Sequence, residues 1–394
     1  MTVAEGSNVI TPSIALKTID GLPQGGPIYI YGSSVGGRRM HRVLTVLAGV
    51  EIAGFVDTFK SGELLGLPIL SLEAFKELDH RRITLVIASS FFKPIYESVA
   101  SLPLAACFDA RPILRIVPPF VGEDDLSMED DAFRAFIEWR MRETAVERSL
   151  HGSSAPFPVR VKFNAVDRPS YAWSMLEAAK LAVALGIPAI SAIEFGVAGG
   201  NGLVALEEYA DEIEKIMPVK FAIFGFDTGV GLPPTKDYRD VPFQWQEGDY
   251  RMDQDALRRR LTRSELILGE IGQTIGTFFE THRPPPLGCC FIDVDYYSST
   301  AQALKCFEAN SRHYLPRVNC YFDDIQSEFV GELLAIKEFN ARHPMRKFAQ
   351  NRLKIGHLHV TPALWHELVY DFHDFAHPLY NARESSKTNV SPLL

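Results

Sequence analysis

Short apolar runs alternate with amphipathic stretches along the whole chain, which is the pattern of a parallel sheet covered by helices. Helical spacing of apolar residues is clearest over 167–186 and 203–215. The pattern predicts an α/β protein in which a Rossmann-like domain is preceded by a smaller Rossmann-like domain, with ligands at the carboxyl ends of the strands. The expected strands are 27–31, 52–56, 69–70, 84–88, 190–193, 221–226, 266–269, 291–295, 318–322 and 354–360.

Composition divides the chain into three parts. Residues 1–117 carry the first α/β pattern, and residues 161–394 carry the second pattern and a C-terminal tail. Between them, residues 118–160 read as an acidic, proline-bearing linker followed by a helix over 132–150 that bridges the domains.

The first domain opens on a strand, a glycine turn and a helix. Asp57 lies about 20 residues beyond the turn, where a Rossmann acid contacts a ribose, but Ser34 replaces the middle glycine of the dinucleotide pattern. The stretches Tyr-Gly-Ser-Ser-Val-Gly-Gly, Gly-Phe-Val-Asp and Gly-Leu-Pro-Ile-Leu-Ser resemble the nucleotide-sugar-binding domain of bacterial sugar acyltransferases. The resemblance implies a nucleotide-sugar ligand, and the alternative is a docking or dimerising domain. No cluster of acids, bases or thiols predicts chemistry here.

The second domain opens on a similar but richer turn. A strand ends in Glu194, glycines follow at Gly196, Gly199 and Gly200, and a helix begins near Leu203. Glycines allow a ligand to approach the backbone closely, and the helix N-terminus offers free N–H groups. Asp227, after the next strand, is placed to accept hydrogen bonds from ribose hydroxyls. That arrangement serves NAD and S-adenosylmethionine enzymes alike.

Four carboxylates mark the ends of two later strands that we expect to be neighbours. Asp293 and Asp295 are two residues apart and face the same side if the chain stays extended, and Asp323 and Asp324 end the next strand. Crowded carboxylates repel one another unless a cation lies among them, and ligand sets made of oxygen select hard ions. The alternative is that these acids cap helices and bind nearby hydroxyls.

Four blocks in this order resemble the macrocin O-methyltransferase family over about residues 190–340: Ile-Glu-Phe-Gly-Val-Ala-Gly-Gly-Asn-Gly, Gly-Phe-Asp-Thr-Gly-Val-Gly-Leu-Pro, Ile-Asp-Val-Asp-Tyr-Tyr-Ser-Ser-Thr and Phe-Asp-Asp. The resemblance implies S-adenosylmethionine as cofactor and a divalent metal, expected to be Mg2+, for methyl transfer to a hydroxyl, often of a sugar. It assigns the metal to Asp293, Asp323 and Asp324, and the general base to Asp295. The implied cofactor residues are Glu194, Gly196, Ala198, Gly199, Gly200, Asn201, Asp227, Thr228 and Gly269.

Two features depart from that family. Thr-Gly-Val-Gly stands at 228–231 where the family commonly has Ser-Phe-Glu-Gly, and the insert at 234–253, with Trp245 and Tyr250, is longer than expected. The acceptor, expected to be a sugar or nucleotide sugar, therefore stays open. The competing hypotheses are a metal-independent methyltransferase acting on nitrogen or carbon, a nucleotide-sugar-binding protein, and an NAD-linked oxidoreductase.

Composition narrows the partners. The formal charge of −9 argues against nucleic acid, and no apolar run reaches the length of about 20 residues that crosses a membrane. The N-terminus lacks the pattern of a secretory signal, and the five cysteines show no disulfide or metal spacing. We expect a cytoplasmic protein that forms a homo-oligomer and acts on a small molecule.

Overall fold

The computed structural model describes residues 11–19, 22–23, 25–117, 129–325, 327–350 and 364–382. The strand expected at 354–360 lies outside these residues. The chain forms two compact units, residues 1–154 and 155–394, each built around its own sheet.

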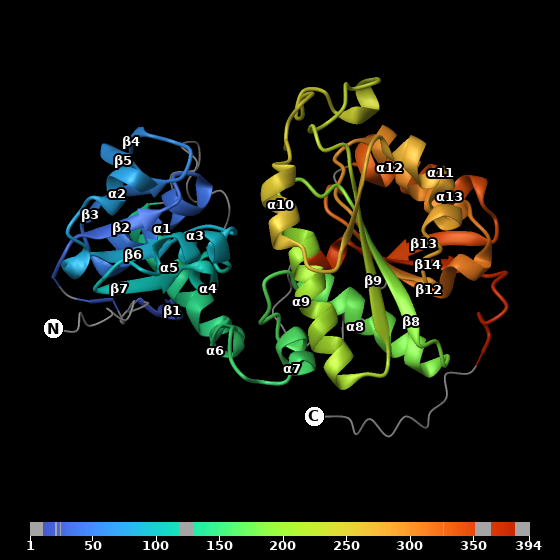
Figure 1. Cartoon of the computed structure of the whole chain (residues 1–394), viewed down its shortest axis with the longest axis horizontal. Helices are drawn as coiled ribbons and strands as arrows, with labels where there is room; N and C mark the ends of the chain where they lie inside the picture. The colour runs from blue at the N-terminus through green and yellow to red at the C-terminus, as the bar shows by residue number, and fades with distance from the viewer. Residues whose placement is uncertain are drawn as a thin grey trace, which may run out of the picture. The chain divides into compact units, whose positions relative to one another are not determined.

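The first unit contains a seven-stranded sheet in the order β1-β7-β6-β2-β3-β5-β4, in which only the short β4 runs antiparallel to its neighbour (Figure 1). Its strands are β1 (Ser13–Ala15), β2 (Ile28–Tyr31), β3 (Ile52–Asp57), β4 (Gly62–Leu64), β5 (Leu67–Ser71), β6 (Thr84–Ile87) and β7 (Ala106–Asp109). Its helices are α1 (Val35–Ala48), α2 (Leu72–Lys76), α3 (Phe92–Val99), α4 (Arg111–Leu114), α5 (Asp130–Glu143) and α6 (Ala145–Leu150).

The single helix predicted over 132–150 is two helices. The break falls at Thr144, whose backbone angles (φ −100°, ψ 14°) depart from helical values although its N–H and its hydroxyl both donate to the carbonyl oxygen of Arg140. Helix α5 packs on the first unit, because Phe133 and Ile137 are fully buried in its core.

The second unit contains a seven-stranded sheet in the order β10-β9-β8-β11-β12-β14-β13, parallel except for β14, which runs antiparallel to both of its neighbours. Its strands are β8 (Ala189–Phe195), β9 (Lys220–Asp227), β10 (Glu265–Leu268), β11 (Leu287–Ile292), β12 (Tyr314–Phe322), β13 (Arg346–Gln350) and β14 (Val369–Asp374). Its helices are α7 (Phe157–Lys162), α8 (Pro169–Ala184), α9 (Asn201–Ile216), α10 (Gln254–Arg260), α11 (Ile271–Thr281), α12 (Tyr297–Ala303) and α13 (Gly331–Arg342).

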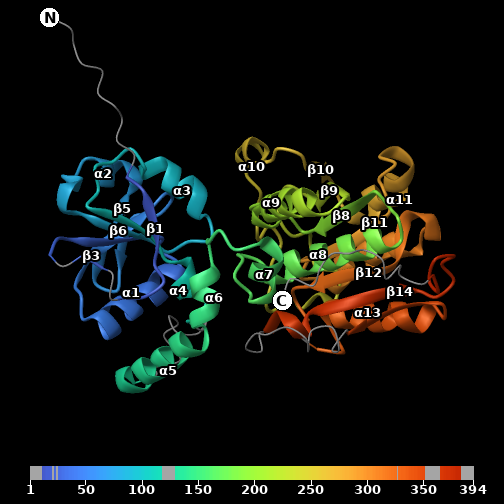
Figure 2. The same ribbon diagram turned by 90° about the horizontal axis from the view of Figure 1, so that it is seen from below.

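Helices cover both faces of this sheet, with α8 and α9 on one face and α11, α12 and α13 on the other (Figures 1 and 2). Strand β11 illustrates this two-sided cover, because its successive side chains point to opposite faces of the sheet. Cys289 and Phe291 pack in the core under α8 and α9, and Cys290 and Ile292 pack in the core on the other face. The fold class predicted from sequence, two Rossmann-like α/β units, is confirmed.

The order of the strands reverses between β8 and β11, where sheets of this kind have a crevice outside the carboxyl ends of the strands. From β8 the chain adds β9 and β10 on one side, and it then returns to place β11 and β12 on the other side. Sheets of this kind bind ligands at such a reversal, outside the carboxyl ends of the strands. The two strand ends that flank this reversal carry the glycine turn and Asp293.

One local prediction, the extended strand over 291–295, was wrong. Strand β11 ends at Ile292 rather than at Asp295, and the φ of +58° at Asp295 is left-handed, so the chain between the two aspartates is not extended. Helix α8 begins at Pro169, and its cap position is Arg168. In the part of the chain that the structure describes, no helix has the length and apolar character needed to cross a bilayer.

Candidate active site

The residues that the sequence analysis selected gather at the carboxyl ends of the parallel strands of the second unit. They lie in the last residues of β8 and β9 or directly after β8, β9, β10, β11 and β12. At the end of β8 lie Glu194, Gly196, Ala198, Gly199, Gly200 and Asn201, and at the end of β9 lie Asp227 and Thr228. Gly269 follows β10, Asp293 and Asp295 follow β11, and Asp323 and Asp324 follow β12.

Two glycines of the turn after β8, and Gly202 in the first turn of α9, are required by their neighbours. At Gly196, with φ +83°, an added Cβ would lie 1.7 Å from the carbonyl oxygen of Asp293. At Gly200, with φ +79°, it would lie 2.0 Å from Leu257 Cδ1, and at Gly202 it would lie 1.7 Å from Glu194 Oε1. The turn therefore packs directly against the end of β11, against α10 and against the acid that precedes it.

Asp227 joins the glycine turn to the end of β9. Its Oδ2 accepts the backbone N–H groups of Val197 and Ala198 at 2.8 and 2.9 Å, and its Oδ1 accepts that of Gly229 at 2.6 Å. The side chain expected to bind a ribose thus also fixes the shape of the turn. Ala198, with φ +44°, holds a backbone conformation that L-residues adopt rarely and that is common at functional sites.

Glu194 is buried, with 2% of its surface exposed, and its Oε1 accepts the hydroxyl of Tyr171 at 2.8 Å. Its Oε2 has no hydrogen-bond partner among the residues described. Burial raises the pKa of Glu194 to about 7, although Arg168 and the Tyr171 hydroxyl favour the charged form. Glu194 therefore ties α8 to the glycine turn as well as lying next to the crevice.

Asp293, Asp323 and Asp324 come together as the sequence predicted, each with one carboxylate oxygen within 4.8 Å of those of the others. Burial, and then repulsion from Asp323 and Glu194, raise the pKa of Asp293 well above its ordinary value. Crowded carboxylates repel one another, and a hard divalent ion among them would relieve that repulsion. The donor set, three carboxylates on two adjacent strand ends, therefore fits Mg2+ or Mn2+.

Asp295 lies beside this cluster, with 7% of its surface exposed, and its carboxyl group is hydrogen-bonded to that of Asp324. Burial and the charge of Asp293 raise the pKa of Asp295 to about 7, and burial and the charge of Asp295 raise that of Asp324 to about 8. Aspartate tolerates the left-handed backbone better than most residues, which explains how the chain turns here. This turn brings Asp295 to the same cluster as Asp293, although the two residues do not share an extended strand.

Several side chains around the cluster were missed by the sequence analysis. The hydroxyl of Tyr321 donates to Asp323 Oδ1, and Glu332, fully buried at the start of α13, accepts the backbone N–H of Asp324 at 3.0 Å. The other carboxylate oxygen of Glu332 has no partner among the described residues. Because each of these residues stands alone in the sequence, no motif or spacing could have marked them.

The segment that follows β9, residues 228–253, forms a wall next to Asp295. Asp240, fully buried, accepts both the backbone N–H and the hydroxyl of Ser298 at the start of α12, at 2.8 and 3.0 Å. Trp245 packs with Tyr296 in a small apolar cluster. Tyr250 is 56% exposed, and burial and the charge of Asp295 raise its pKa. An aromatic ring is thus available at the edge of the acidic cluster.

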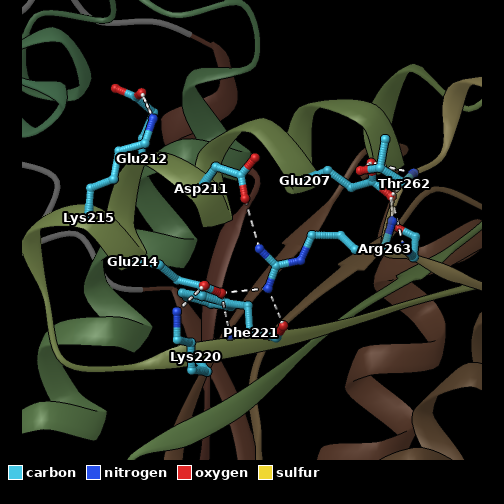
Figure 3. A network of polar contacts seen from close by, with 10 residues as sticks. Glu207, Asp211, Glu212, Glu214, Lys215, Lys220, Phe221, Thr262 and Arg263 are labelled. Carbon is cyan, nitrogen blue, oxygen red and sulfur yellow. Dashed lines mark hydrogen bonds and ion pairs between the residues drawn. The ribbon is translucent and has the colours of Figure 1, made fainter.

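A second clamp holds the turn from the side of α10. Arg260 donates to the carbonyl oxygen of Gly199 and to Asn201 Oδ1, both at 2.7 Å. The residues just after α10 are fixed on α9 and β9, as Figure 3 shows: Arg263 donates to Asp211, Glu214 and the carbonyl oxygen of Phe221. Glu207 accepts the backbone N–H groups of residues 262–264 at 2.7–3.0 Å.

We expect Glu207→Gln to destabilise the second unit by about 2–3 kcal/mol, because hydrogen bonds to a buried charged acceptor contribute most and the amide would turn an N–H toward these donors. Burial opposes the charge of Glu207, but the bonds from residues 262–264 outweigh it and lower its pKa. The contribution is therefore complete above the unfolded-state pKa and is lost as the pH falls through the folded-state value.

Urea unfolding at pH 7 and at lower pH would measure this difference. Glu212→Gln on the same helix is the control, since its partly exposed ion pairs with Lys215 and Arg160 contribute at most about 1 kcal/mol. Equal effects of the two substitutions at pH 7 would contradict the stabilising role assigned to the hydrogen bonds that Glu207 accepts.

The first unit has its own glycine turn, but both carboxylate oxygens of the acid beside it, Asp57, already accept hydrogen bonds from the protein. Asp57 Oδ2 accepts both the backbone N–H and the hydroxyl of Ser33, at 3.0 and 2.6 Å. Its Oδ1 accepts the backbone N–H groups of Phe59 and Lys60. Asp57 thus shapes its own turn, and the nucleotide-sugar ligand of this unit stays a prediction.

No protein-family model and no curated protein matches this chain. Among solved structures, the calicheamicin methyltransferase CalS11 is 18% identical over 60% of this chain and 93% of its own, with a TM-score of 0.38. The O-methyltransferase NovP is 13% identical over 44% and 72%, with a TM-score of 0.35. The plantazolicin methyltransferase BamL, solved with S-adenosylhomocysteine (SAH), is 8% identical over 59% and 94%, with a TM-score of 0.28. At TM-scores this low, the likenesses identify no activity for this chain.

Proposed function

We propose that the second unit is an S-adenosylmethionine-dependent methyltransferase that transfers a methyl group to a hydroxyl of a sugar or glycosylated small molecule, as the resemblance to the macrocin O-methyltransferase family implies. The observation that carries the proposal is the meeting of Asp293, Asp323 and Asp324 within 4.8 Å, at the end of the crevice that the glycine turn also borders.

The residues have separate roles in this proposal. The turn from Gly196 to Gly202 and Asp227 bind the cofactor, and Asp293, Asp323 and Asp324 hold a divalent cation. When bound, such a cation supplies Lewis-acid polarisation, which lowers the pKa of a hydroxyl. The chain then has to hold that oxygen in line with the methyl group and accept its proton, and Asp295 is the base beside the cluster.

The wall formed by residues 228–253 is consistent with an acceptor that contains a ring, such as a sugar. Tyr250 offers an exposed aromatic face next to Asp295 and Asp324, and its side chain is hydrogen-bonded to Trp245. A sugar presents an apolar ring face for such a surface and vicinal hydroxyls for the cation. The wall is anchored through Asp240 on α12, so its position is set by the same elements that carry the carboxylates.

Calorimetry with SAH tests the cofactor. We expect SAH to bind and NADH not to bind, and Asp227→Ala to weaken SAH binding by about 1.5–3 kcal/mol through the loss of hydrogen bonds to a charged group. Asp237→Ala is the matched control, because Asp237 also accepts the backbone N–H two residues later but lies on the surface of the insert. Unchanged SAH affinity in Asp227→Ala, or binding of NADH in place of SAH, would reject the assignment.

The five cysteines are all unpaired and buried, which supports a reducing compartment such as the cytoplasm. The homo-oligomer expected from sequence stays a prediction, and size-exclusion chromatography with light scattering would measure it.

A further inference from the structure

Arg168 lies at the crevice although no sequence motif marks it. Its backbone N–H donates to the hydroxyl of Tyr209 at 3.0 Å, and its guanidinium lies 4.9 Å from the centre of the Tyr171 ring. The hydroxyl of Tyr171 donates in turn to Glu194. Packing and hydrogen bonding therefore hold the guanidinium next to the strand end that carries the glycine turn.

The guanidinium of Arg168 has no hydrogen-bond acceptor among the residues described, although it carries five N–H donors. Burial opposes its charge, but Tyr171 and the carboxylates of Glu194 and Asp293 outweigh burial and raise its pKa. The group is thus a fixed cation with free donors, and its natural ligand is a carboxylate or a phosphate.

The charges of the surrounding acids favour the carboxylate of an amino acid over a phosphate as the ligand of Arg168. A phosphate dianion would be repelled by Glu194, Asp293 and Asp323, all of which lie close enough to act on Arg168. An α-amino acid is neutral overall, since it carries an ammonium beside its carboxylate, so it can satisfy the arginine without adding net negative charge. The amino-acid end of S-adenosylmethionine has this chemistry.

We infer that Arg168 binds the α-carboxylate of the amino-acid end of the cofactor and so orients the sulfonium in the crevice, an inference that rests on the proposed function. The bond is a charge-assisted, two-pronged pair of guanidinium and carboxylate, a geometry that lysine does not reproduce. Arg168 is a binding residue in this view, not a counter-charge that only balances the acids.

Three ligands test this on the wild-type protein without any variant. SAH carries the complete amino-acid end, its decarboxylated analogue S-adenosyl-3-thiopropylamine lacks only the carboxylate, and 5′-methylthioadenosine lacks the amino acid altogether. We expect the decarboxylated analogue to bind about 10- to 100-fold more weakly than SAH in calorimetry, the value of hydrogen bonds between charged groups. Equal affinities of SAH and this analogue would overturn the inference.

Variants complete the cycle. Arg168→Met should weaken SAH about 10- to 100-fold, leave 5′-methylthioadenosine within about 3-fold, and abolish the difference between SAH and its decarboxylated analogue. Arg168→Lys should recover part of the SAH affinity. Arg160→Met is the matched control, since Arg160 also stacks on an aromatic ring, that of Phe157, and pairs with Glu212 outside the site.

The outcomes are distinct. If Arg168→Met keeps the SAH preference of the wild type and only tightens Mg2+ binding, Arg168 is a counter-charge of the acids and the inference is wrong. Equal losses of SAH and 5′-methylthioadenosine would likewise reject a role at the carboxylate. If the wild type binds none of the three ligands, the proposed function itself fails, which is a different result.

Discussion

Removal of divalent cations is expected to abolish methyl transfer, and Asp323→Asn is expected to abolish cation binding and activity together. The reason is that the proposed site has three carboxylate donors, with oxygens within 4.8 Å of one another, so the loss of one negative donor removes a third of their charge. Activity would be measured as SAH release with a panel of nucleotide-linked and methyl glycosides, in excess chelator and after addition of Mg2+ or Mn2+.

A second measurement does not depend on the acceptor. A cation that binds only the folded protein stabilises it by about 2.7 kcal/mol at one hundred times its Kd, which raises the Tm of a unit of this size by about 5–10 °C. Mg2+ should produce this shift in the wild type and not in Asp323→Asn. Without metal the substituted protein should be as stable as the wild type or more so, because one repelling charge is gone.

Asp249→Asn is the matched control for this site. Its carboxylate acts on Asp295 through space, yet it is not one of the three carboxylates that meet. It should keep the Mg2+ shift and the activity. Full turnover in excess chelator, with no metal found by elemental analysis, would reject the site and favour the metal-independent methyltransferase that acts on nitrogen or carbon.

Asp295→Asn is expected to keep the cation and lose about 10²- to 10⁴-fold in kcat, which is the usual contribution of a general base. Asparagine has nearly the same shape and also tolerates the left-handed backbone at this position, where φ is +58°. Its amide can also preserve the hydrogen bond to Asp324. The substitution therefore removes the proton acceptor with little change in structure.

Two further readouts separate a base from a structural residue. Asp295→Asn should show the Mg2+ thermal shift and the SAH affinity of the wild type, since neither the cation nor the cofactor is assigned to Asp295. A kcat within about 3-fold of the wild type would mean that another group accepts the proton. Loss of the Mg2+ shift would instead make Asp295 a fourth ligand of the cation.

The sequence by itself determined the fold class and the strand ends at which the site lies. Apolar runs mark buried strands because a sheet covered on both faces has no polar side. Glycine at 196 and 200 marks left-handed backbone, which few other residues adopt, and the structure has φ +83° and +79° there. Acids directly after parallel strands meet at one sheet edge, which is why Asp293, Asp323 and Asp324 could be grouped before their contacts were known.

The tertiary structure decided how each acid is used. The sequence pattern placed Asp295 beside Asp293 on an extended strand, which was wrong. The strand ends at Ile292, and a turn brings the side chain of Asp295 back to the cluster. Asp227 binds the turn that follows β8, and Arg168, Tyr171 and Glu332 reach the site from the starts of α8 and α13. Such partners depend on packing between elements, and packing leaves no period or spacing in the sequence.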